Sequence, residues 1–269
     1  MSPLVPPSPA SLSSTPPYRL LELDALGSGT LGPDMLGPGA GQAPGPLADE
    51  ALLRHAIDGP VACLWHAAQG LVVPRTYAAR SGFAQAQADF ARRGWPIHVR
   101  QSGGGVVPQG PGILNLSLAQ RFAGRPLDHS ETCYRQLCGL IAAALLHWGI
   151  DTRAQAVEGS FCDGRYNLAS GQPARKVVGT AQVWRHIPGQ PPDQQIGLVH
   201  ALILVRCSPQ ETTAQANALE AALGSPRRYD AGKIASLDQL IAATRRADFE
   251  RGFAQTLKDT IAHSRAIAA

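Results

Sequence analysis

The stretch Val99-Arg100-Gln101-Ser102-Gly103-Gly104-Gly105-Val106-Val107 sets three consecutive glycines between two strand-like runs. Glycine has no side chain to pack and loses much conformational entropy on ordering, so packing does not explain a triple glycine. Without Cβ atoms, the backbone N–H groups of these glycines can approach a ligand closely. Arg100 and Ser102 beside them can donate further hydrogen bonds. The stretch therefore predicts a ligand-binding turn between strands.

Two familiar phosphate-binding loops do not fit this turn. No Gly-Lys-Ser/Thr follows it, as a P-loop requires, and no helix opens after it, as a dinucleotide-binding fingerprint requires. A flexible turn without a ligand is the plain alternative. A second tight turn, Gly110-Pro111-Gly112, leads into an alternating strand and favours the binding interpretation. Backbone amides can still bind nucleotide phosphates in another geometry.

Composition places the chain among globular proteins. Of its 269 residues, 44% are hydrophobic and 16% are charged, which allows one large domain or two small ones. The net charge is +4, and Lys and Arg occur as scattered pairs without interleaved aromatic residues. This pattern argues against a dedicated nucleic-acid-binding protein and leaves an acidic protein partner open.

Cysteine and histidine usage predicts neither disulfides nor a metal site. The five cysteines include no CxxC pair, and the histidines show no HxH or HxxxH spacing. The N-terminus lacks the charged and apolar regions of a signal peptide, and no apolar run is long enough to span a bilayer. We therefore expect a cytoplasmic protein that does not enter a membrane.

The positions of the Pro- and Gly-rich segments predict a single catalytic domain. Residues 1–17 are rich in Pro and Ser and are expected to be disordered, and residues 18–269 are expected to form a single domain. A Gly/Pro-rich loop over 27–46 lies inside this domain, and 207–269 form its helical C-terminal part.

Strands outnumber helices in the middle of the chain. Hydrophobic periodicity predicts strands at 18–23, 61–65, 71–73, 97–100, 106–107, 112–118, 176–183 and 198–205. It predicts helices from residue 48, over 80–92, 130–149 and 208–224, and through the last forty residues. Regular βαβ alternation is not visible, so the predicted fold class is α+β with a mixed sheet.

Lys176 and Cys162 each permit two interpretations. Lys176, in a strand-like run, is either a solvated strand residue or a cation that stabilises negative charge on a carbonyl oxygen. Cys162 lies in a polar, glycine-containing segment, unlike Cys63, Cys138 and Cys207, which have apolar neighbours. It is therefore either inert or, near Arg165 and Lys176, a nucleophile.

Three motifs in order carry a family resemblance. They are the segment 100–115, the segment Gly164-Arg165-Tyr166-Asn167-Leu168, and the segment Arg175-Lys176-Val177-Val178-Gly179-Thr180-Ala181-Gln182. Together with Ala48-Asp49-Glu50 at the start of a helix, they resemble the lipoate-protein ligase A and octanoyltransferase family of the biotin/lipoyl protein ligase superfamily. The resemblance covers about residues 48–205.

The resemblance implies a central mixed sheet flanked by helices and an enzyme that acylates a lysine of a carrier domain. It implies Lys176 and Cys162 as catalytic residues. It implies that the acyl group or adenylate is bound by Arg100, Ser102, Gly103, Gly104, Gly105, Asn115, Arg165, Asn167, Gly179, Thr180 and Ala181. The implied partners are acidic lipoyl carrier domains of 2-oxoacid dehydrogenases or the glycine cleavage carrier, with acyl carrier protein as a further donor.

Three functions follow from the resemblance. A ligase would make an acyl-adenylate from ATP, with Mg²⁺, and free lipoate or octanoate. A transferase would carry the acyl group on Cys162 as a thioester and would need no ATP. A non-catalytic lipoate-binding relative is suggested by Gln101 and Pro108, which replace an arginine and a histidine of the family pattern. A biotin ligase is disfavoured because the Gly-Arg-Gly-Arg-rich loop of that branch is missing.

Overall fold

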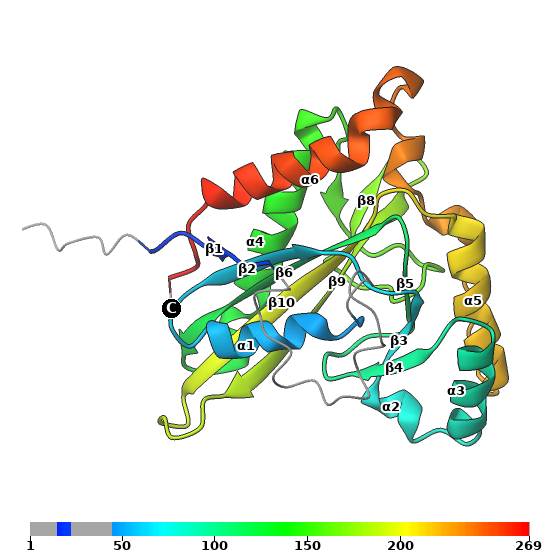
Figure 1. Ribbon diagram of the computed structural model, residues 1–269, viewed down its shortest axis with the longest axis horizontal. Helices are drawn as coiled ribbons and strands as arrows, with labels where there is room; N and C mark the ends of the chain where they lie inside the picture. Colours follow the sequence, from blue (N-terminus) through cyan, green and yellow to red (C-terminus); the bar gives the residue numbers. More distant parts are fainter. Residues whose placement is uncertain (1–14, 23–44, 269) are drawn as a thin grey trace, which may run out of the picture.

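A seven-stranded mixed sheet organises the computed structural model, which describes residues 15–22 and 45–268 (Figure 1). Its order is β1-β2-β6-β10-β9-β8-β7, with β1 parallel to β2 and every other pair antiparallel. The strands are β1 (Arg19–Leu20), β2 (Val61–Trp65), β6 (Ile113–Ala123), β7 (Arg153–Ala154), β8 (Leu168–Ser170), β9 (Arg175–His186) and β10 (Gln194–Leu204). The predicted mixed sheet with flanking helices is confirmed.

A small second sheet holds the glycine-rich turn. Its order is β4-β3-β5, formed by β3 (Gly70–Pro74), β4 (Ile97–Arg100) and β5 (Val107–Gln109). The strands on either side of the turn, β4 and β5, do not pair with each other, because each pairs with β3. The turn therefore crosses the width of β3, a span of roughly 10 Å at ordinary strand spacing.

The small sheet contains a βαβ unit that the sequence analysis did not anticipate. The parallel strands β3 and β4 are joined through α2 (Arg75–Ala78) and α3 (Phe83–Arg92). A helix was expected over 80–92, but Gly82 has a φ of +78°, which is not a helical conformation. The helix α3 therefore begins only at Phe83.

Two helices cover one face of the large sheet. Alternating residues of β6 and β10 project to that face as register partners, such as Leu116 opposite Ala201 and Leu118 opposite Val199. These residues share a buried core with α4 (Pro126–His147) and α6 (Arg246–Ala262). The intervening residues of the same strands project to the other face, toward α1 (Leu52–His55) and the small sheet.

Helix boundaries differ from those predicted where capping decides them. The helix expected from residue 130 begins at Pro126, because Pro suits the first helical position and the Asp128 carboxylate accepts the Arg125 backbone N–H at 3.2 Å. The predicted cap of α5 (Pro209–Ala222) is confirmed, since the Ser208 hydroxyl accepts the Glu211 N–H at 3.1 Å.

The two ends of the chain depart from the predicted pattern. The last forty residues were expected to be helical throughout, but three 3₁₀ turns precede α6: η3 (Ala231–Lys233), η4 (Leu237–Gln239) and η5 (Ala243–Arg245). The helix expected from residue 48 begins as a 3₁₀ turn, η2 (Ala48–Ala51), before α1. Most of the predicted disordered start (1–17) and of the Gly/Pro-rich loop (27–46) lies outside the described residues.

None of the helices in the described ranges has both the length and the apolar character needed to cross a bilayer.

Candidate active site

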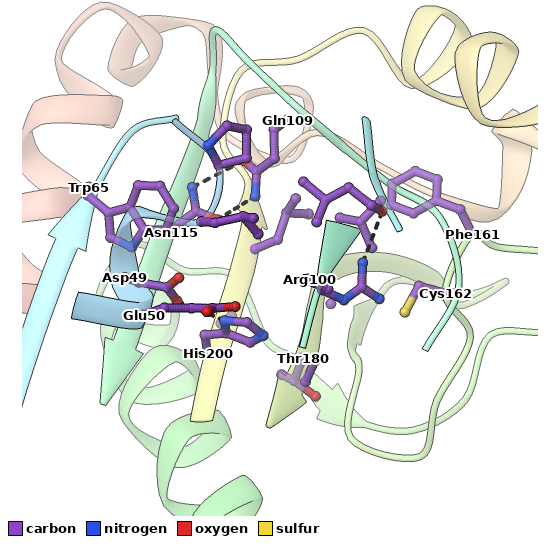
Figure 2. A pocket seen from close by; sticks show the side chains of 18 of the residues that line it. Asp49, Glu50, Trp65, Arg100, Gln109, Asn115, Phe161, Cys162, Thr180 and His200 are labelled. Carbon is purple, nitrogen blue, oxygen red and sulfur yellow. Dashed lines mark hydrogen bonds and ion pairs between the residues drawn. The ribbon is translucent and has the colours of Figure 1, made fainter. Parts of the chain in front are cut away.

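A pocket lies over the face of the large sheet opposite α4 and α6 (Figure 2). Its floor follows from strand register, because Trp65, Asn115, Leu202 and Gly179 are successive partners across β2, β6, β10 and β9. Ser117, His200 and Ala181 form the neighbouring row on the same face. The pocket is lined by Pro46, Leu47, Asp49, Glu50, Trp65, Val72, Arg100, Val107, Gln109, Asn115, Phe161, Cys162, Lys176, Gly179, Thr180, Ala181, His200, Ala201 and Leu202.

Arg100 holds the glycine-rich turn from inside. Its buried guanidinium donates to the carbonyl oxygens of Gly103 and Gly105, both at 2.8 Å, and to that of Val72 at 2.9 Å. Burial lowers the pKa of Arg100, while the charge of the neighbouring Cys162 raises it in part. Most N–H groups of this guanidinium therefore donate to backbone carbonyls, and most of those carbonyls belong to the turn.

Cys162 lies against the same turn. The backbone N–H of Gly105 donates to its Sγ at 3.4 Å. Its φ of +48° is left-handed, which is unusual for a residue with a side chain and makes Cys162 unique among the non-glycine residues that the structure describes. Burial raises the pKa of the Cys63, Cys133, Cys138 and Cys207 thiols to about 12.

Lys176 is fully buried beneath Cys162. Its Nζ donates to the carbonyl oxygens of Phe161 at 2.7 Å and Cys162 at 3.0 Å. Burial lowers the pKa of Lys176 to about 8, although the charges of Cys162 and Asp163 oppose that shift. An ammonium has three N–H donors, so one is left for another acceptor. The interpretation of Lys176 as a solvated strand residue is therefore wrong.

Three other predicted residues meet at this point. Asn167 is buried and donates through Nδ2 to the Cys162 carbonyl at 3.2 Å, so it shares that oxygen with Lys176. The Thr180 hydroxyl donates to the Tyr166 carbonyl at 3.0 Å. Gly179 allows a close approach, because a Cβ there would lie 2.9 Å from the Lys176 Nζ.

Asn115 lines the pocket within an amide pair. Its Nδ2 donates to Gln109 Oε1 at 3.1 Å, and Gln109 Nε2 donates back to Asn115 Oδ1 at 2.9 Å. Arg165 is not brought to this pocket. Its exposed guanidinium lies 5.2 Å from the centre of the Tyr166 ring and faces a second cavity beside α4.

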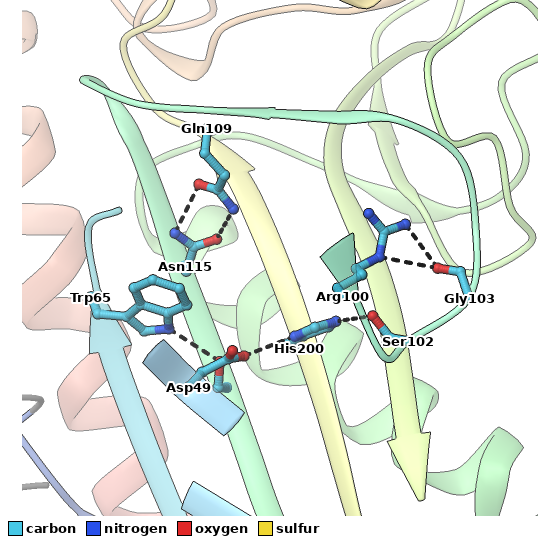
Figure 3. Close-up of polar contacts among 9 residues, drawn as sticks. Asp49, Trp65, Arg100, Ser102, Gly103, Gln109, Asn115 and His200 are labelled. Carbon is cyan, nitrogen blue, oxygen red and sulfur yellow. Dashed lines mark hydrogen bonds and ion pairs between the residues drawn. The ribbon is translucent and has the colours of Figure 1, made fainter. Parts of the chain in front are cut away.

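Sequence reasoning missed a hydrogen-bonded chain along the pocket wall (Figure 3). His200 Nδ1 lies 2.8 Å from Asp49 Oδ2, and His200 Nε2 lies 3.2 Å from Ser102 Oγ. Asp49 also accepts the Ser117 hydroxyl at 2.8 Å, and Ser117 accepts the Trp65 Nε1–H at 3.1 Å. One signal was present in the sequence, since His200 is the polar residue inside the otherwise apolar run 196–204.

Among residues 15–22 and 45–268, no group of three or more His, Cys, Asp or Glu side chains is arranged to hold a metal ion.

Comparison with known proteins agrees with this geometry. Residues 47–244 match the model of the lipoyl protein ligase A/B catalytic domain. An uncharacterized protein from Cupriavidus necator is 50% identical over 84% of this chain and 93% of its own length. An octanoyl-GcvH:protein N-octanoyltransferase from Kyrpidia tusciae is 39% identical, over 44% of this chain and 40% of its own.

The fold is similar to that of a lipoate-protein ligase. The crystal structure of lipoate-protein ligase A bound with ATP superposes with a TM-score of 0.53 at 18% identity, over 78% of each chain. The motifs, the fold and the matched family model thus converge, and the chain belongs to the lipoyl protein ligase A/B catalytic domain family.

Proposed function

We propose that this protein transfers an octanoyl or lipoyl group from one carrier to a lysine of another, through a thioester on Cys162. The supporting observation is the position of the Cys162 sulfur, which lines the pocket and accepts the Gly105 N–H while the buried Lys176 binds the carbonyl of the same residue. A thiol in this position can serve as the nucleophile, because sulfur attacks an acyl carbonyl to form a thioester.

The transfer takes two balanced steps. In the first, Sγ bonds to the acyl carbon, the bond from that carbon to the donor nitrogen breaks, and the thiol proton passes to the departing amine. In the second, the acceptor lysine nitrogen bonds to the acyl carbon, the carbon–sulfur bond breaks, and an amine proton returns to sulfur. The remaining N–H of Lys176 is available to the carbonyl oxygen as negative charge develops.

Two observations favour this route over acyl-adenylate formation. The Arg100 guanidinium donates to backbone carbonyls, and the Gly105 N–H donates to sulfur, so these groups are engaged before any nucleotide enters. The similar region of the Kyrpidia protein belongs to an octanoyltransferase whose named donor is octanoyl-GcvH. The carriers proposed here are accordingly GcvH and lipoyl domains.

The test is to incubate the purified protein with octanoylated GcvH in the absence of ATP and to record the intact mass. We expect a gain of one octanoyl group that hydroxylamine removes, followed by its appearance on an added apo lipoyl domain. Cys162→Ala should abolish both signals, and Lys176→Ala should slow both strongly. Cys207→Ala is the matched control and should leave both signals intact.

Two results would contradict this proposal. Acylation that requires ATP and free octanoate, and that persists in Cys162→Ala, would establish the ligase route instead. Absence of acylation under both conditions, with lipoate still bound, would establish a non-catalytic relative.

A further inference from the structure

The hydrogen-bond chain on the pocket wall runs in one direction. Asp49 is buried and its carboxylate can only accept, so His200 Nδ1–H donates to it; in the neutral imidazole Nε2 then accepts from the Ser102 hydroxyl. Because Asp49 Oδ2 also accepts from Ser117, both hydrogen bonds fix the carboxylate in place. Ser102 is thereby tied through His200 to a rigid point on the large sheet.

This order of groups is also that of a serine hydrolase triad, but access argues against a nucleophilic Ser102. Ser102 is only 3% exposed, and its side chain is absent from the described lining of the pocket, whereas His200 is part of that lining. A hydroxyl that is buried and absent from this lining is not presented to an acyl carbonyl in the pocket. The chain therefore acts on the turn and not on the substrate.

A second acidic residue of η2 lies near the same end of the turn. The Gln101 backbone lowers the pKa of the neighbouring Glu50 carboxyl, against the larger effect of burial. Burial raises the pKa of Glu50, and the charge of Asp49 raises it further. Residue 102 is thus held by η2 through His200, while residues 103 and 105 are held by Arg100.

We propose that Asp49 and His200 are positioning residues for acyl transfer: through Ser102 they fix the Gly103–Gly105 turn so that the Gly105 N–H meets the Cys162 sulfur. This role rests on the transfer function proposed above. Loss of the His200–Ser102 bond would free the first half of the turn, while Arg100 would still hold the second half. The Gly105 N–H would then meet the sulfur for a smaller fraction of the time.

Two conservative substitutions separate the two bonds of His200. In His200→Asn the amide can take the place of Nδ1 and keep the bond to Asp49, but it does not reach Ser102. In His200→Gln the amide can take the place of Nε2 and keep the bond to Ser102. Ser102→Ala removes the same bond from the other side, and Ser102→Thr retains a hydroxyl. His186→Gln, on the exposed end of β9, is the matched control.

The readouts are the rate at which iodoacetamide alkylates Cys162 at pH 7 and the rate and KM of octanoyl transfer. We expect His200→Asn and Ser102→Ala each to slow alkylation and transfer about tenfold, as the loss of one hydrogen bond predicts, without a change in KM for the acceptor. His200→Gln and Ser102→Thr should stay within about threefold of the parent. The double variant Ser102→Ala/His200→Asn should be no slower than either single variant.

Several outcomes would overturn the positioning role. These are equal rates for the Asn and Gln variants, independent effects in the double variant, or an octanoyl ester found on Ser102. Alkylation needs no acyl donor, so it still tests the turn if Cys162→Ala shows that transfer does not use this cysteine. A failure of the transfer function is therefore distinguishable from a failure of the positioning role.

Discussion

The backbone of Gly104 passes so close to Cys162 that a Cβ atom on Gly104 would lie 2.7 Å from the cysteine Sγ. The same Cβ would lie 3.0 Å from Nη2 of Arg100. Gly104 also has a φ of +109°, where residues with side chains are strained. The turn and the thiol are therefore fitted to each other, and the middle glycine has both a steric and a conformational reason to be glycine.

Gly104→Ala should therefore destabilise the protein and disturb Cys162. We expect a loss of roughly 1–3 kcal/mol in the free energy of unfolding, the range for one residue held in an unfavourable backbone region. Alkylation of Cys162 should change in rate as the sulfur is displaced. Urea unfolding and the iodoacetamide rate at pH 7 measure the two effects.

Gly103→Ala is the control, because a Cβ there would meet nothing within 4 Å and its φ is not positive. It should change the free energy of unfolding by less than about 1 kcal/mol. If the two variants have the same free energy of unfolding, the close fit between Gly104 and Cys162 does not contribute to stability.

Lys176 should make stability depend on pH in the alkaline range. Burial lowers its pKa from the usual 10.5 to about 8, so between these values the unfolded chain binds a proton that the folded protein has lost. The free energy of unfolding must then rise with pH across this window, and the gain is lost as pH falls through about 8. The full difference corresponds to roughly 3 kcal/mol.

The measurement compares the parent with Lys176→Met by urea unfolding from pH 7 to pH 10.5. Buried tyrosines and cysteines titrate in both proteins, so the difference between the two curves isolates the lysine. Above pH 8, we expect the free energy of unfolding of the parent to rise steadily relative to that of the variant. Parallel curves would mean that the ammonium is not held at a lowered pKa.

The sequence predicted the parts of the site whose neighbours are close along the chain. Arg100 and the glycines that it contacts are three to five residues apart, and Gly179 follows Lys176 by three residues, so local pattern was enough. Asp49 and His200 are 151 residues apart and meet only through the register that sets His200 opposite Ser117. Before the strand pairing is known, Asp49 is explained as an acidic residue at the start of a helix and His200 as one residue of a strand.

The direction of side chains in an irregular segment was the second feature that the sequence could not predict. Cys162 and Arg165 lie three residues apart in the same polar stretch, and both were predicted to belong to the site. The left-handed conformation of Cys162 turns the chain there, so the cysteine lines the pocket while Arg165 points to solvent beside Tyr166. Strand or helix periodicity carries no information about side-chain direction in such a segment.

Gly179→Ala should impair acylation while leaving the fold intact. A Cβ at position 179 would lie 2.9 Å from Nζ and 3.0 Å from Cε of Lys176, which are the flexible end of a side chain. The lysine can move away, but its hydrogen bonds to the Phe161 and Cys162 carbonyls would then lengthen. We expect octanoylation of Cys162 to slow about tenfold, equivalent to one weakened hydrogen bond.

Gly139→Ala on α4 is the control, because its Cβ would meet nothing within 4 Å. It should leave the octanoylation rate unchanged and raise the free energy of unfolding by up to about 1 kcal/mol through helix propensity. An unchanged rate in Gly179→Ala would show that the exact position of the ammonium does not matter for acylation.

The amide pair of Gln109 and Asn115 should show strong coupling. Both side chains are buried, and each donates one N–H to the other, so Asn115→Leu leaves the Gln109 amide without that partner. A buried amide without a hydrogen-bond partner lowers the free energy of unfolding by about 1–3 kcal/mol. When both amides are replaced, no unpaired amide remains and this loss does not occur. The double variant Gln109→Leu/Asn115→Leu should therefore be more stable than Asn115→Leu alone.

Urea unfolding of the parent, both single variants and the double variant closes a double-mutant cycle. We expect a coupling free energy between about 0.5 and 3 kcal/mol, the range for residues in direct contact. Additive losses would mean that water or another group satisfies each amide once its partner is gone. Because both residues line the pocket, the cycle also measures how strongly the polar part of its wall is held together.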